Sequence, residues 1–289
     1  MRLRTLPLSL AGVITGIALA MGGPGVRMLP VVLLLLTTVL LQILTNLSNE
    51  LGDTLHGTDT DSRQGIRYSL QDGIMTVRQM KTLIAVFALL SCLAGLAMIR
   101  AAFGTLFAIA PAFFIVLGAC AVWAAMRYTL GRKPYGYRGL GDLSVFIFFG
   151  LATVAGGYFL SSLQMPSLRV IAAACGIGCF SVAVLNVNNI RDMKTDMATR
   201  TTVAILLGEK KARIYQTVLI VLGWVFLGIA LLRPGLAPQK YLFLLTLPLY
   251  IVHLRGVWTR SDRALDPMLP LLVMSTFLLS LLLLAGAVL

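Results

Sequence analysis

The chain has 289 residues, of which 58% are hydrophobic and 12% are charged. A soluble domain carries about 25% charged residues, so this composition excludes an ordinary soluble protein and indicates a polytopic, all-α membrane protein. The formal net charge of +13 does not require nucleic acid, because basic loops beside an anionic bilayer produce the same excess. We therefore expect the lipid bilayer as a partner, and neither nucleic acid nor an obligate protein partner.

Apolar runs of roughly 15 to 24 residues follow one another along the chain, and each is long enough to cross a hydrocarbon core as a helix, tilted where it is longest. We expect nine transmembrane helices in a bundle, with a cytoplasmic cap of loop helices. The expected spans are 6–22, 29–50, 81–99, 103–126, 142–161, 168–190, 214–232, 240–254 and 268–289.

Basic residues alternate in step with this span count. The N-terminus and the connections after even-numbered spans hold 19 of the 24 Lys and Arg residues, and the connections after odd-numbered spans hold the other 5. Basic connections remain in the cytoplasm. We therefore expect a multi-pass membrane protein, with the N-terminus cytoplasmic and the C-terminus outside. The long polar connections 51–80, 127–141 and 191–213 then share the cytoplasmic side.

A polar stretch follows the apolar run 31–44. If the helix continues, four amide and carboxylate groups share one of its faces: Asn46, Asn49, Glu50 and Asp53. Such groups at the end of a membrane helix are costly unless they bind something. They offer only oxygen ligands, which suit Mg²⁺. A solvated, capped helix end is the alternative.

The connection 127–141 combines basic residues, tyrosines and glycines. Cations and phenol groups suit a polyanion such as diphosphate. The candidate binding residues are Tyr128, Arg132, Lys133, Tyr137 and Arg138. A basic loop with interfacial tyrosines has the same composition, so this alternative stays open.

A second polar stretch follows the apolar run 170–185 and repeats the spacing of the first. Asn188-Asn189-x-x-Asp192 aligns without a gap with the earlier stretch, and Asp196 continues the same helical face. Two matched helix ends suggest two halves of one site. The neighbouring Arg191, Lys194 and Arg200 are candidates for binding the same anion or for anchoring the helix end.

The repeated pattern also predicts the domain organisation. We expect a single integral-membrane domain over residues 1–289, made of two pseudo-repeated halves, roughly 1–126 and 142–254, and a last helix.

Carboxylates and cations at one membrane face suit a phosphorylated lipid whose diphosphate is held through Mg²⁺. Stabilising diphosphate as it leaves allows an allylic C–O bond to ionise. The resulting carbocation needs a pocket that excludes water. A transporter is the alternative from another class, although transporter sites usually lie near the bilayer midplane.

These motifs resemble those of the UbiA-type intramembrane prenyltransferases. The similar stretches are Arg4-Thr-Leu-Pro7-Leu-Ser9, Asn46-x-x-Asn49-Glu50-x-x-Asp53-x-x-x-Gly57-x-Asp59, Arg132-Lys-Pro-Tyr-Gly-Tyr-Arg-Gly-Leu-Gly141-Asp142 and Asn186-x-Asn-Asn-x-Arg-Asp192-x-x-x-Asp196. The acidic motifs are shared across the family. The Tyr-Gly-Tyr-Arg-Gly-Leu-Gly loop is similar to that of the members that use 1,4-dihydroxy-2-naphthoate.

The resemblance implies a nine-helix fold in the bacterial inner membrane, whose active site opens to the cytoplasmic side under a cap. It implies transfer of a polyprenyl chain from its diphosphate to 1,4-dihydroxy-2-naphthoate, with release of CO₂ and diphosphate. The product would be demethylmenaquinone, an intermediate of menaquinone biosynthesis. Another aromatic acceptor, such as 4-hydroxybenzoate, is the alternative.

The resemblance also implies roles for single residues. Mg²⁺ and diphosphate would be held by Asn49, Glu50, Asp53, Asp192 and Asp196, and the diphosphate also by Tyr128, Arg132 and Lys133. Glu50 departs from the family pattern, which usually has Asp there. Asp59 would orient or deprotonate the acceptor, and Asn46 lies on the substrate-binding face. We expect His56 and His253 to be interfacial rather than catalytic.

Overall fold

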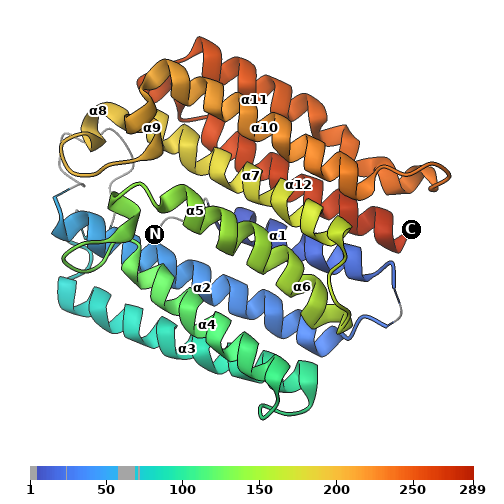
Figure 1. Ribbon diagram of the computed structural model, residues 1–289. Coiled ribbons are helices and arrows are strands. Elements are labelled where there is room, and N and C mark those ends of the chain that lie inside the picture. The colour runs from blue at the N-terminus through green and yellow to red at the C-terminus, as the bar shows by residue number, and fades with distance from the viewer. Residues whose placement is uncertain (1–4, 24, 58–68, 71) are drawn as a thin grey trace.

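Helices account for the regular structure of this protein in a computed structural model (Figure 1). The structure describes residues 5–23, 25–57, 69–70 and 72–289. No β-strand occurs among these residues, and the long helices lie side by side in one bundle. The predicted all-α membrane fold is therefore confirmed.

Two sets of elements build the structure. The bundle helices are α1 (Leu6–Ala20), α2 (Met28–Leu55), α3 (Val77–Phe103), α4 (Ile109–Arg127), α6 (Thr153–Ser162), α7 (Leu168–Arg191), α10 (Glu209–Leu231), α11 (Leu247–Thr259) and α12 (Met268–Val288). The shorter elements are η2 (Tyr135–Tyr137), α5 (Gly141–Val145), the π-helix η3 (Phe146–Ala152), α8 (Met193–Asp196), α9 (Val203–Leu207), η4 (Pro238–Thr246) and η5 (Asp262–Leu265).

Eight stretches of the described residues are long and apolar enough to cross a membrane, and the 15-residue α1 adds a shorter apolar helix. The predicted nine-helix bundle is therefore confirmed. Some membrane spans consist of several consecutive helical elements. The span Gly141–Ser162, for example, contains α5, η3 and α6. At 1.5 Å per residue α1 is about 22 Å long. It is accommodated inside the bundle because α6 and α12 pack along it.

Helix α3 extends four residues beyond each end of the expected span 81–99, and capping residues explain where it begins and ends. Oγ1 of Thr76 accepts a hydrogen bond from the backbone N–H of Gln79 (3.2 Å), and Oε1 of Gln79 accepts one from the backbone N–H of Thr76 (2.8 Å). At the other end, Gly104 adopts φ 72°, a conformation that glycine adopts at little cost. The next helix consequently begins at Ile109 instead of residue 103.

Helix α7 is the most buried span, because 83% of the residues in its apolar 18-residue stretch are buried inside the protein. It packs against α10, α12 and η3. Small residues allow this close packing: a Cβ added to Gly150 of η3 would lie 2.5 Å from Cα of Gly178. The approach of these two glycines fixes η3 beside the helix that carries the second polar stretch.

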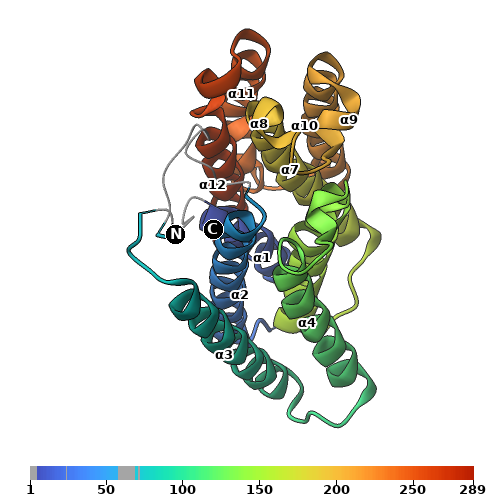
Figure 2. The ribbon, with the colours of Figure 1, turned by 90° about the vertical axis from the view of Figure 1, so that its left-hand side faces the viewer.

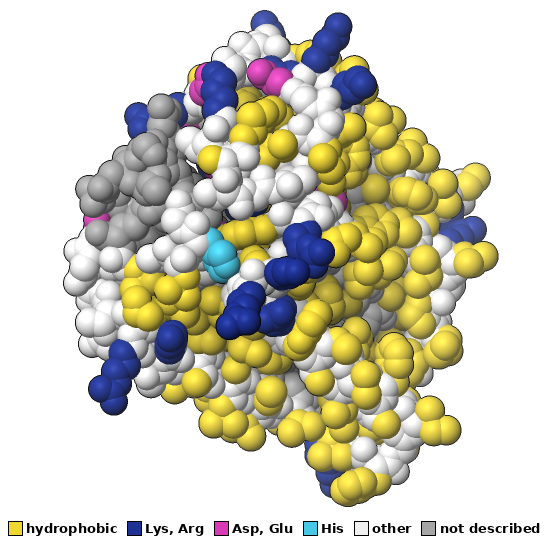
Figure 3. All heavy atoms as spheres, turned by 60° about the vertical axis from the view of Figure 1, so that its left-hand side comes forward, with side chains coloured by type: hydrophobic (Ala, Val, Ile, Leu, Met, Phe, Trp, Pro, Cys, Tyr) yellow, Lys and Arg dark blue, Asp and Glu magenta, His cyan; other side chains and the backbone are white. Residues whose placement is uncertain are grey.

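Apolar side chains cover much of the outside of the bundle, as Figure 3 shows. Exposed examples come from several spans: Leu89, Phe113, Val221 and Ile229. Such a surface is stable against lipid tails and would be costly in water. The lipid bilayer is therefore the environment that this surface fits.

The polar connections gather at one end of the bundle, which faces the viewer in Figure 2. The short helices α8 and α9 and the turn η2 lie there, so the expected cap of loop helices is confirmed. Helix α12 ends at the opposite end of the bundle (Figure 1). The division into pseudo-repeated halves, 1–126 and 142–254, stays a prediction.

Candidate active site

A cavity of about 1290 Å³ lies inside the bundle, between the first seven helices and the start of α12. Part of its wall is apolar, with Leu34, Phe114 and Leu160 among the lining residues. Its polar lining residues include Asn46, Asn49, Asp142, Asn188, Asn189 and Arg200. An apolar chamber with convergent polar groups suits a ligand with a long apolar tail and a polar head.

Helix α2 carries the first acidic motif to the cavity. It continues to Leu55, so the predicted helical extension beyond residue 50 is confirmed. Asn46 and Asn49 line the cavity, and Oδ1 of Asp53 accepts a hydrogen bond of 2.6 Å from the phenol of Tyr137. Glu50 is buried, and its Oε1 accepts a hydrogen bond from the backbone N–H of Leu70 (3.2 Å).

The second acidic motif is not one continuous helix, contrary to the prediction. Helix α7 ends at Arg191, and Asp192 separates it from the short α8. The guanidinium of Arg191 folds back and donates to both carboxylate oxygens of Asp192, at 2.7 and 2.6 Å. It also donates to Oδ1 of Asn188 (2.9 Å) and to Oδ1 of Asp266 (2.8 Å). Arg191 thus connects the second motif to η5.

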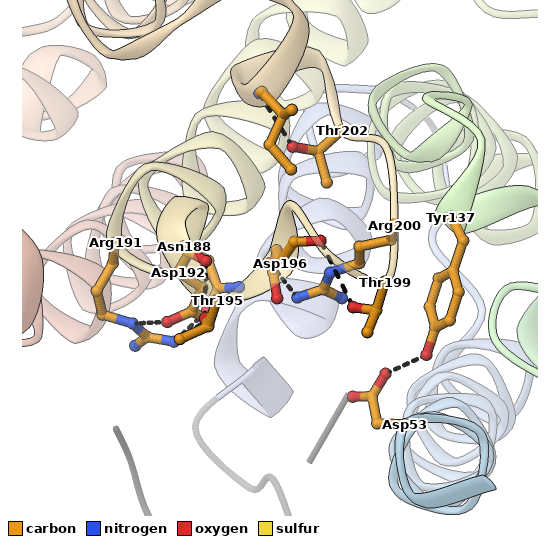
Figure 4. Close-up of polar contacts among 11 residues, drawn as sticks. Asp53, Tyr137, Asn188, Arg191, Asp192, Thr195, Asp196, Thr199, Arg200 and Thr202 are labelled. Atoms are coloured by element: carbon orange, nitrogen blue, oxygen red, sulfur yellow. Dashed lines mark hydrogen bonds and ion pairs between the residues drawn. The ribbon is translucent and has the colours of Figure 1, made fainter. Parts of the chain in front are cut away.

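Arg200 lies between the two motifs. Figure 4 shows its guanidinium next to Asp196 and facing the Tyr137–Asp53 pair, and Nη2 donates to Oδ2 of Asp196 at 2.5 Å. Burial alone would lower the pKa of Arg200, but the charges of Asp196 and Asp53 outweigh burial and raise the pKa above its ordinary value. The cavity therefore contains a permanent positive charge beside acids from both motifs.

Backbone hydrogen bonds join the two connections that carry these side chains. The N–H of Thr201 donates to the carbonyl of Tyr137, and the N–H of Gly139 donates to the carbonyl of Thr201, both at 3.0 Å. This backbone pairing holds the segment of Tyr137 next to the segment of Arg200. The side chains of Tyr137 and Arg200 therefore lie close together although they are distant in the sequence.

Tyr128 follows the last residue of α4, and its phenol lies in the polar part of the cavity. A Cβ added to Gly141 would lie 2.8 Å from its hydroxyl, so only glycine leaves room for it there. Burial raises the pKa of Tyr128 above its ordinary value. The side chain therefore stays a neutral phenol that can donate a hydrogen bond to an anion.

The sequence profile of the UbiA prenyltransferase family matches residues 9–282. The chain belongs to the UbiA prenyltransferase family. The 1,4-dihydroxy-2-naphthoate octaprenyltransferase of Escherichia coli (strain K12) is 38% identical over 289 aligned residues, which cover 99% of this chain and 92% of that protein. The protein of the same name from Mycobacterium tuberculosis (strain ATCC 25618 / H37Rv) is 35% identical, over 77% of this chain and 73% of its own.

Solved UbiA structures share the fold at low sequence identity. A UbiA homolog from Archaeoglobus fulgidus, solved with GPP and Mg²⁺ bound, superposes with a TM-score of 0.63 at 17% identity, over 98% of both chains. A structure concerning digeranylgeranylglyceryl phosphate synthase superposes with a TM-score of 0.62 at 14% identity, over 99% of this chain. Both support the nine-helix UbiA fold of this chain.

Several predicted anion-binding residues of this UbiA protein lie outside the cavity. Arg132, Lys133 and Arg138 are exposed on the cap and do not line it. Figure 3 shows Lys and Arg side chains gathered on this face. Lys194 is also exposed and pairs with Asp262 at 3.0 Å. Asp59 lies outside the described residues.

The two histidines have structural partners. The ring nitrogens of His56 lie 2.9 Å from the carbonyl of Gly52 and 3.1 Å from that of Gly131. His253 is not interfacial as predicted, because it is fully buried. Its Nδ1 lies 3.0 Å from the carbonyl of Met268 and its Nε2 lies 2.9 Å from Nε2 of Gln216.

Arg200, for which the sequence left anion binding and anchoring open, lines the cavity. Two further lining residues had no role assigned from the sequence. Asp142 ends the middle loop and was part of the family pattern without a role. Gln42 lines the cavity four residues before Asn46 and donates to its Oδ1 (3.1 Å). Extending the helical spacing of the first motif backwards by one turn would have found it.

The donor set suits Mg²⁺, because both motifs present carboxylate and amide oxygens. Among the residues that the structure describes, no group of three or more His, Cys, Asp or Glu side chains is placed to hold an ion. That arrangement fits Mg²⁺, which usually takes one or two carboxylates together with substrate phosphates instead of a complete protein cage. The residues present are therefore compatible with a magnesium ion bound together with a diphosphate.

Proposed function

We propose that this protein transfers a polyprenyl chain from its diphosphate to 1,4-dihydroxy-2-naphthoate, with loss of CO₂ and diphosphate. The direct product is demethylmenaquinol, which oxygen in air oxidises to demethylmenaquinone. The observation that carries the proposal is the 38% identity to the E. coli octaprenyltransferase over 99% of the chain. The cavity supports it independently, because it combines an apolar chamber with acids and a buried arginine.

The diphosphate binds at the polar end of the cavity. Arg200 and the phenol of Tyr128 face the same space there, and they provide a charge and a hydrogen-bond donor for phosphate oxygens. Asn49 and Asn188 line this part of the wall. The prenyl chain extends along the apolar wall formed by residues such as Leu34 and Phe114.

Magnesium is the cofactor in this proposal, with Asn49, Asp53, Asp192 and Asp196 as the residues that would hold it together with the diphosphate. When bound, the ion neutralises charge on the diphosphate and so assists its departure. The chain's own residues prepare the site: Tyr137 orients Asp53, Arg191 orients Asp192, and Arg200 orients Asp196.

Exclusion of water is the remaining requirement, because water would capture the allylic cation. The carboxylates of Asp53 and Asp196 are each 1% exposed. Apolar side chains such as Leu34 and Phe114 line the rest of the cavity. A water-poor, apolar chamber favours capture of the cation by the aromatic ring.

The protein is a multi-pass protein of the bacterial inner membrane. For its orientation we propose a cytoplasmic N-terminus, an external C-terminus and an active site that opens to the cytoplasmic side. The distribution of Lys and Arg supports this orientation, since 19 of 24 fall on the side assigned to the cytoplasm.

A turnover assay tests the proposed function. Purified protein in lipid receives Mg²⁺, a long prenyl diphosphate and either 1,4-dihydroxy-2-naphthoate or 4-hydroxybenzoate, and products are identified by mass. We expect a product of demethylmenaquinone mass from the naphthoate alone. Product from hydroxybenzoate alone would retain the fold and the diphosphate site and overturn the acceptor. No product from either, with folded protein, would contradict the enzyme.

A further inference from the structure

Asp142 is a cavity-lining acid that belongs to neither acidic motif. It lies in the first turn of α5 (Gly141–Val145), where the Tyr-Gly-Tyr loop ends, and its side chain faces the cavity. Its Oδ2 accepts a hydrogen bond from the phenol of Tyr215 on α10 at 3.1 Å. In the part of the chain that the structure describes, no Lys, Arg or His forms an ion pair with it.

A carboxylate in this position is costly for the protein. Asp142 is half-buried inside a membrane bundle, and a single phenol compensates much less charge than a guanidinium does. The acids of the second motif are held differently, because Asp192 and Asp196 each bind an arginine. The surroundings of Asp142 therefore suit a ligand group that donates a hydrogen bond and carries no negative charge.

Tyr128 separates this acid from the diphosphate side of the cavity. Its hydroxyl lies so close to the backbone at Gly141 that a Cβ there would be 2.8 Å away. The charges of both Arg200 and Asp142 also reach this phenol. The polar end consequently has two sides, one with Arg200 and the acidic motifs and the other with Asp142 and Tyr215.

Hydroxyl-bearing side chains continue the second side. The phenol of Tyr135 lies 3.0 Å from Oγ of Ser144, and both residues line the cavity. Tyr135 also stands at 90° to Tyr128, with ring centroids 5.4 Å apart. A flat aromatic ring carrying hydroxyl groups matches these aromatic faces and hydroxyl groups.

We propose that Asp142 binds a ring hydroxyl of the aromatic acceptor and accepts its proton during prenyl transfer, with Tyr215 as the residue that positions Asp142. This inference rests on the proposed function. In 1,4-dihydroxy-2-naphthoate, the carbon that bears the carboxylate is adjacent to one hydroxyl, and the neighbouring ring carbon is adjacent to the other hydroxyl. A base at one hydroxyl therefore activates the ring carbon beside it.

The O–H bond breaks and its proton passes to the carboxylate of Asp142. The freed electron pair forms the ring C=O, and a ring π pair forms the new bond from the carboxylate-bearing carbon to the allylic carbon. The allylic C–O bond breaks, and its electron pair leaves with the diphosphate. The C–CO₂ bond of the resulting β-keto carboxylate then breaks and releases CO₂. Its electron pair restores the aromatic ring, and the ring oxygen takes the proton back from Asp142.

The first test compares Asp142→Asn with wild type in the turnover assay, using 1,4-dihydroxy-2-naphthoate, a long prenyl diphosphate and Mg²⁺. Asn keeps the shape but cannot accept the proton, so we expect kcat to fall at least about 100-fold. The KM for prenyl diphosphate should change by less than about threefold. Tyr215→Phe should lower kcat by about 3- to 10-fold. Glu209→Gln, an exposed acid on the same helix α10, is the matched control and should retain wild-type kinetics.

The second test uses the two monomethyl ethers of the naphthoate as acceptors. One ether blocks the hydroxyl that Asp142 contacts, so wild-type kcat/KM should fall with that ether alone. In Asp142→Asn the same ether should have an effect of less than about twofold, because the interaction is already absent. A merely structural role of Asp142 would leave the discrimination between hydroxyl and methoxy intact.

The outcomes separate this inference from the proposed function. Wild type that makes no product from the naphthoate contradicts the proposed function. Active wild type together with an Asp142→Asn variant of normal kcat, or with undiminished ether discrimination, overturns the role of Asp142. If Asp142→Asn does not fold, as judged by binding of prenyl diphosphate, Tyr215→Phe decides: unchanged ether discrimination and unchanged kcat in that variant overturn the inference.

Discussion

The phenol of Tyr137 donates a 2.6 Å hydrogen bond to Oδ1 of Asp53, which lies 84 residues earlier in the chain. Both side chains are buried. Because Tyr137 is also paired through its backbone carbonyl with Thr201, this contact connects the first acidic motif to the connection that follows the second. The geometry of the proposed diphosphate site therefore depends on contacts of Tyr137 with two segments that are distant in the sequence.

Removing this hydroxyl should impair catalysis without unfolding the protein. Hydrogen bonds to charged groups contribute about 1.5–3 kcal/mol, so Tyr137→Phe should lower kcat/KM for prenyl diphosphate by about 10- to 100-fold. Steady-state kinetics in lipid measure the change. Tyr241→Phe is the matched control, because Tyr241 donates to the carbonyl of Arg233 far from the cavity. Equal kinetics of the two variants would show that Tyr137 does not support Asp53.

Arg200 and Lys133 provide a second test, because both were anion-binding candidates and only Arg200 is buried in the cavity. Arg200→Ala leaves the carboxylates of Asp196 and Asp53 without their neutralising charge, so binding of prenyl diphosphate should weaken at least about 100-fold. Lys133 is exposed, and Lys133→Ala should weaken binding by less than about fivefold.

Binding titrations with labelled prenyl diphosphate measure both variants. Arg200→Lys is informative as well, since it keeps the charge and loses the planar, two-pronged hydrogen bonding. We expect it to recover only part of the affinity. A larger loss in Lys133→Ala than in Arg200→Ala would instead place the diphosphate at the exposed loop.

Local sequence patterns predict much of this fold. Apolar runs and their polar boundaries predict nine helices, because a membrane-spanning segment must satisfy its backbone polar groups within itself. The spacing of Asn46, Asn49 and Asp53 predicts a helix that continues past the apolar run, and α2 does continue. The same spacing fails for Asp192 and Asp196, where Arg191 binds the Asp192 carboxylate and the helix stops.

Contacts between distant segments are what the sequence does not reveal. Glu50 shares the helical spacing of Asp53, and its Oε1 accepts a hydrogen bond from the backbone N–H of Leu70. Helical periodicity does not predict such a contact with a residue outside the helix. The cap pairing of Thr201 with Tyr137 is equally invisible to spacing. Basic residues such as Lys133 look alike in sequence whether buried or exposed, since burial is decided by tertiary packing.

Metal removal gives a third prediction. EDTA should abolish turnover, and added Mg²⁺ should restore it, because the two motifs provide oxygen ligands without a complete protein cage. Asp53→Asn and Asp192→Asn should each raise the Mg²⁺ concentration needed for half-maximal activity. Thermal unfolding offers a readout besides activity: Mg²⁺ and prenyl diphosphate together should raise the Tm of wild type more than either alone. Full activity in EDTA, or an unchanged Mg²⁺ requirement in both variants, would contradict the magnesium site.

Gly52, next to Asp53 in the first motif, gives the last prediction. A Cβ at this position would lie 2.5 Å from Cβ and 2.7 Å from the carbonyl oxygen of Thr129, whose hydroxyl donates to the carbonyl of Ser48 (2.8 Å). Gly52→Ala therefore forces α2 away from the end of α4, at a cost of about 1–3 kcal/mol for overpacking. We expect a lower Tm and a kcat lowered by about tenfold or more, since Asp53 moves with the helix.

The matched control is Gly228→Ala on α10, where a Cβ would make an ordinary contact of 3.6 Å with Leu232. Alanine is favoured over glycine inside a helix by about 0.5–1 kcal/mol, so this variant should be as active as wild type and at least as stable. Thermal unfolding and turnover, measured on both variants in the same lipid, test whether the loss is specific to Gly52. Wild-type kcat in Gly52→Ala would mean that α2 can shift against Thr129 without moving Asp53, and that the close approach of the two helix ends does not set the geometry of the site.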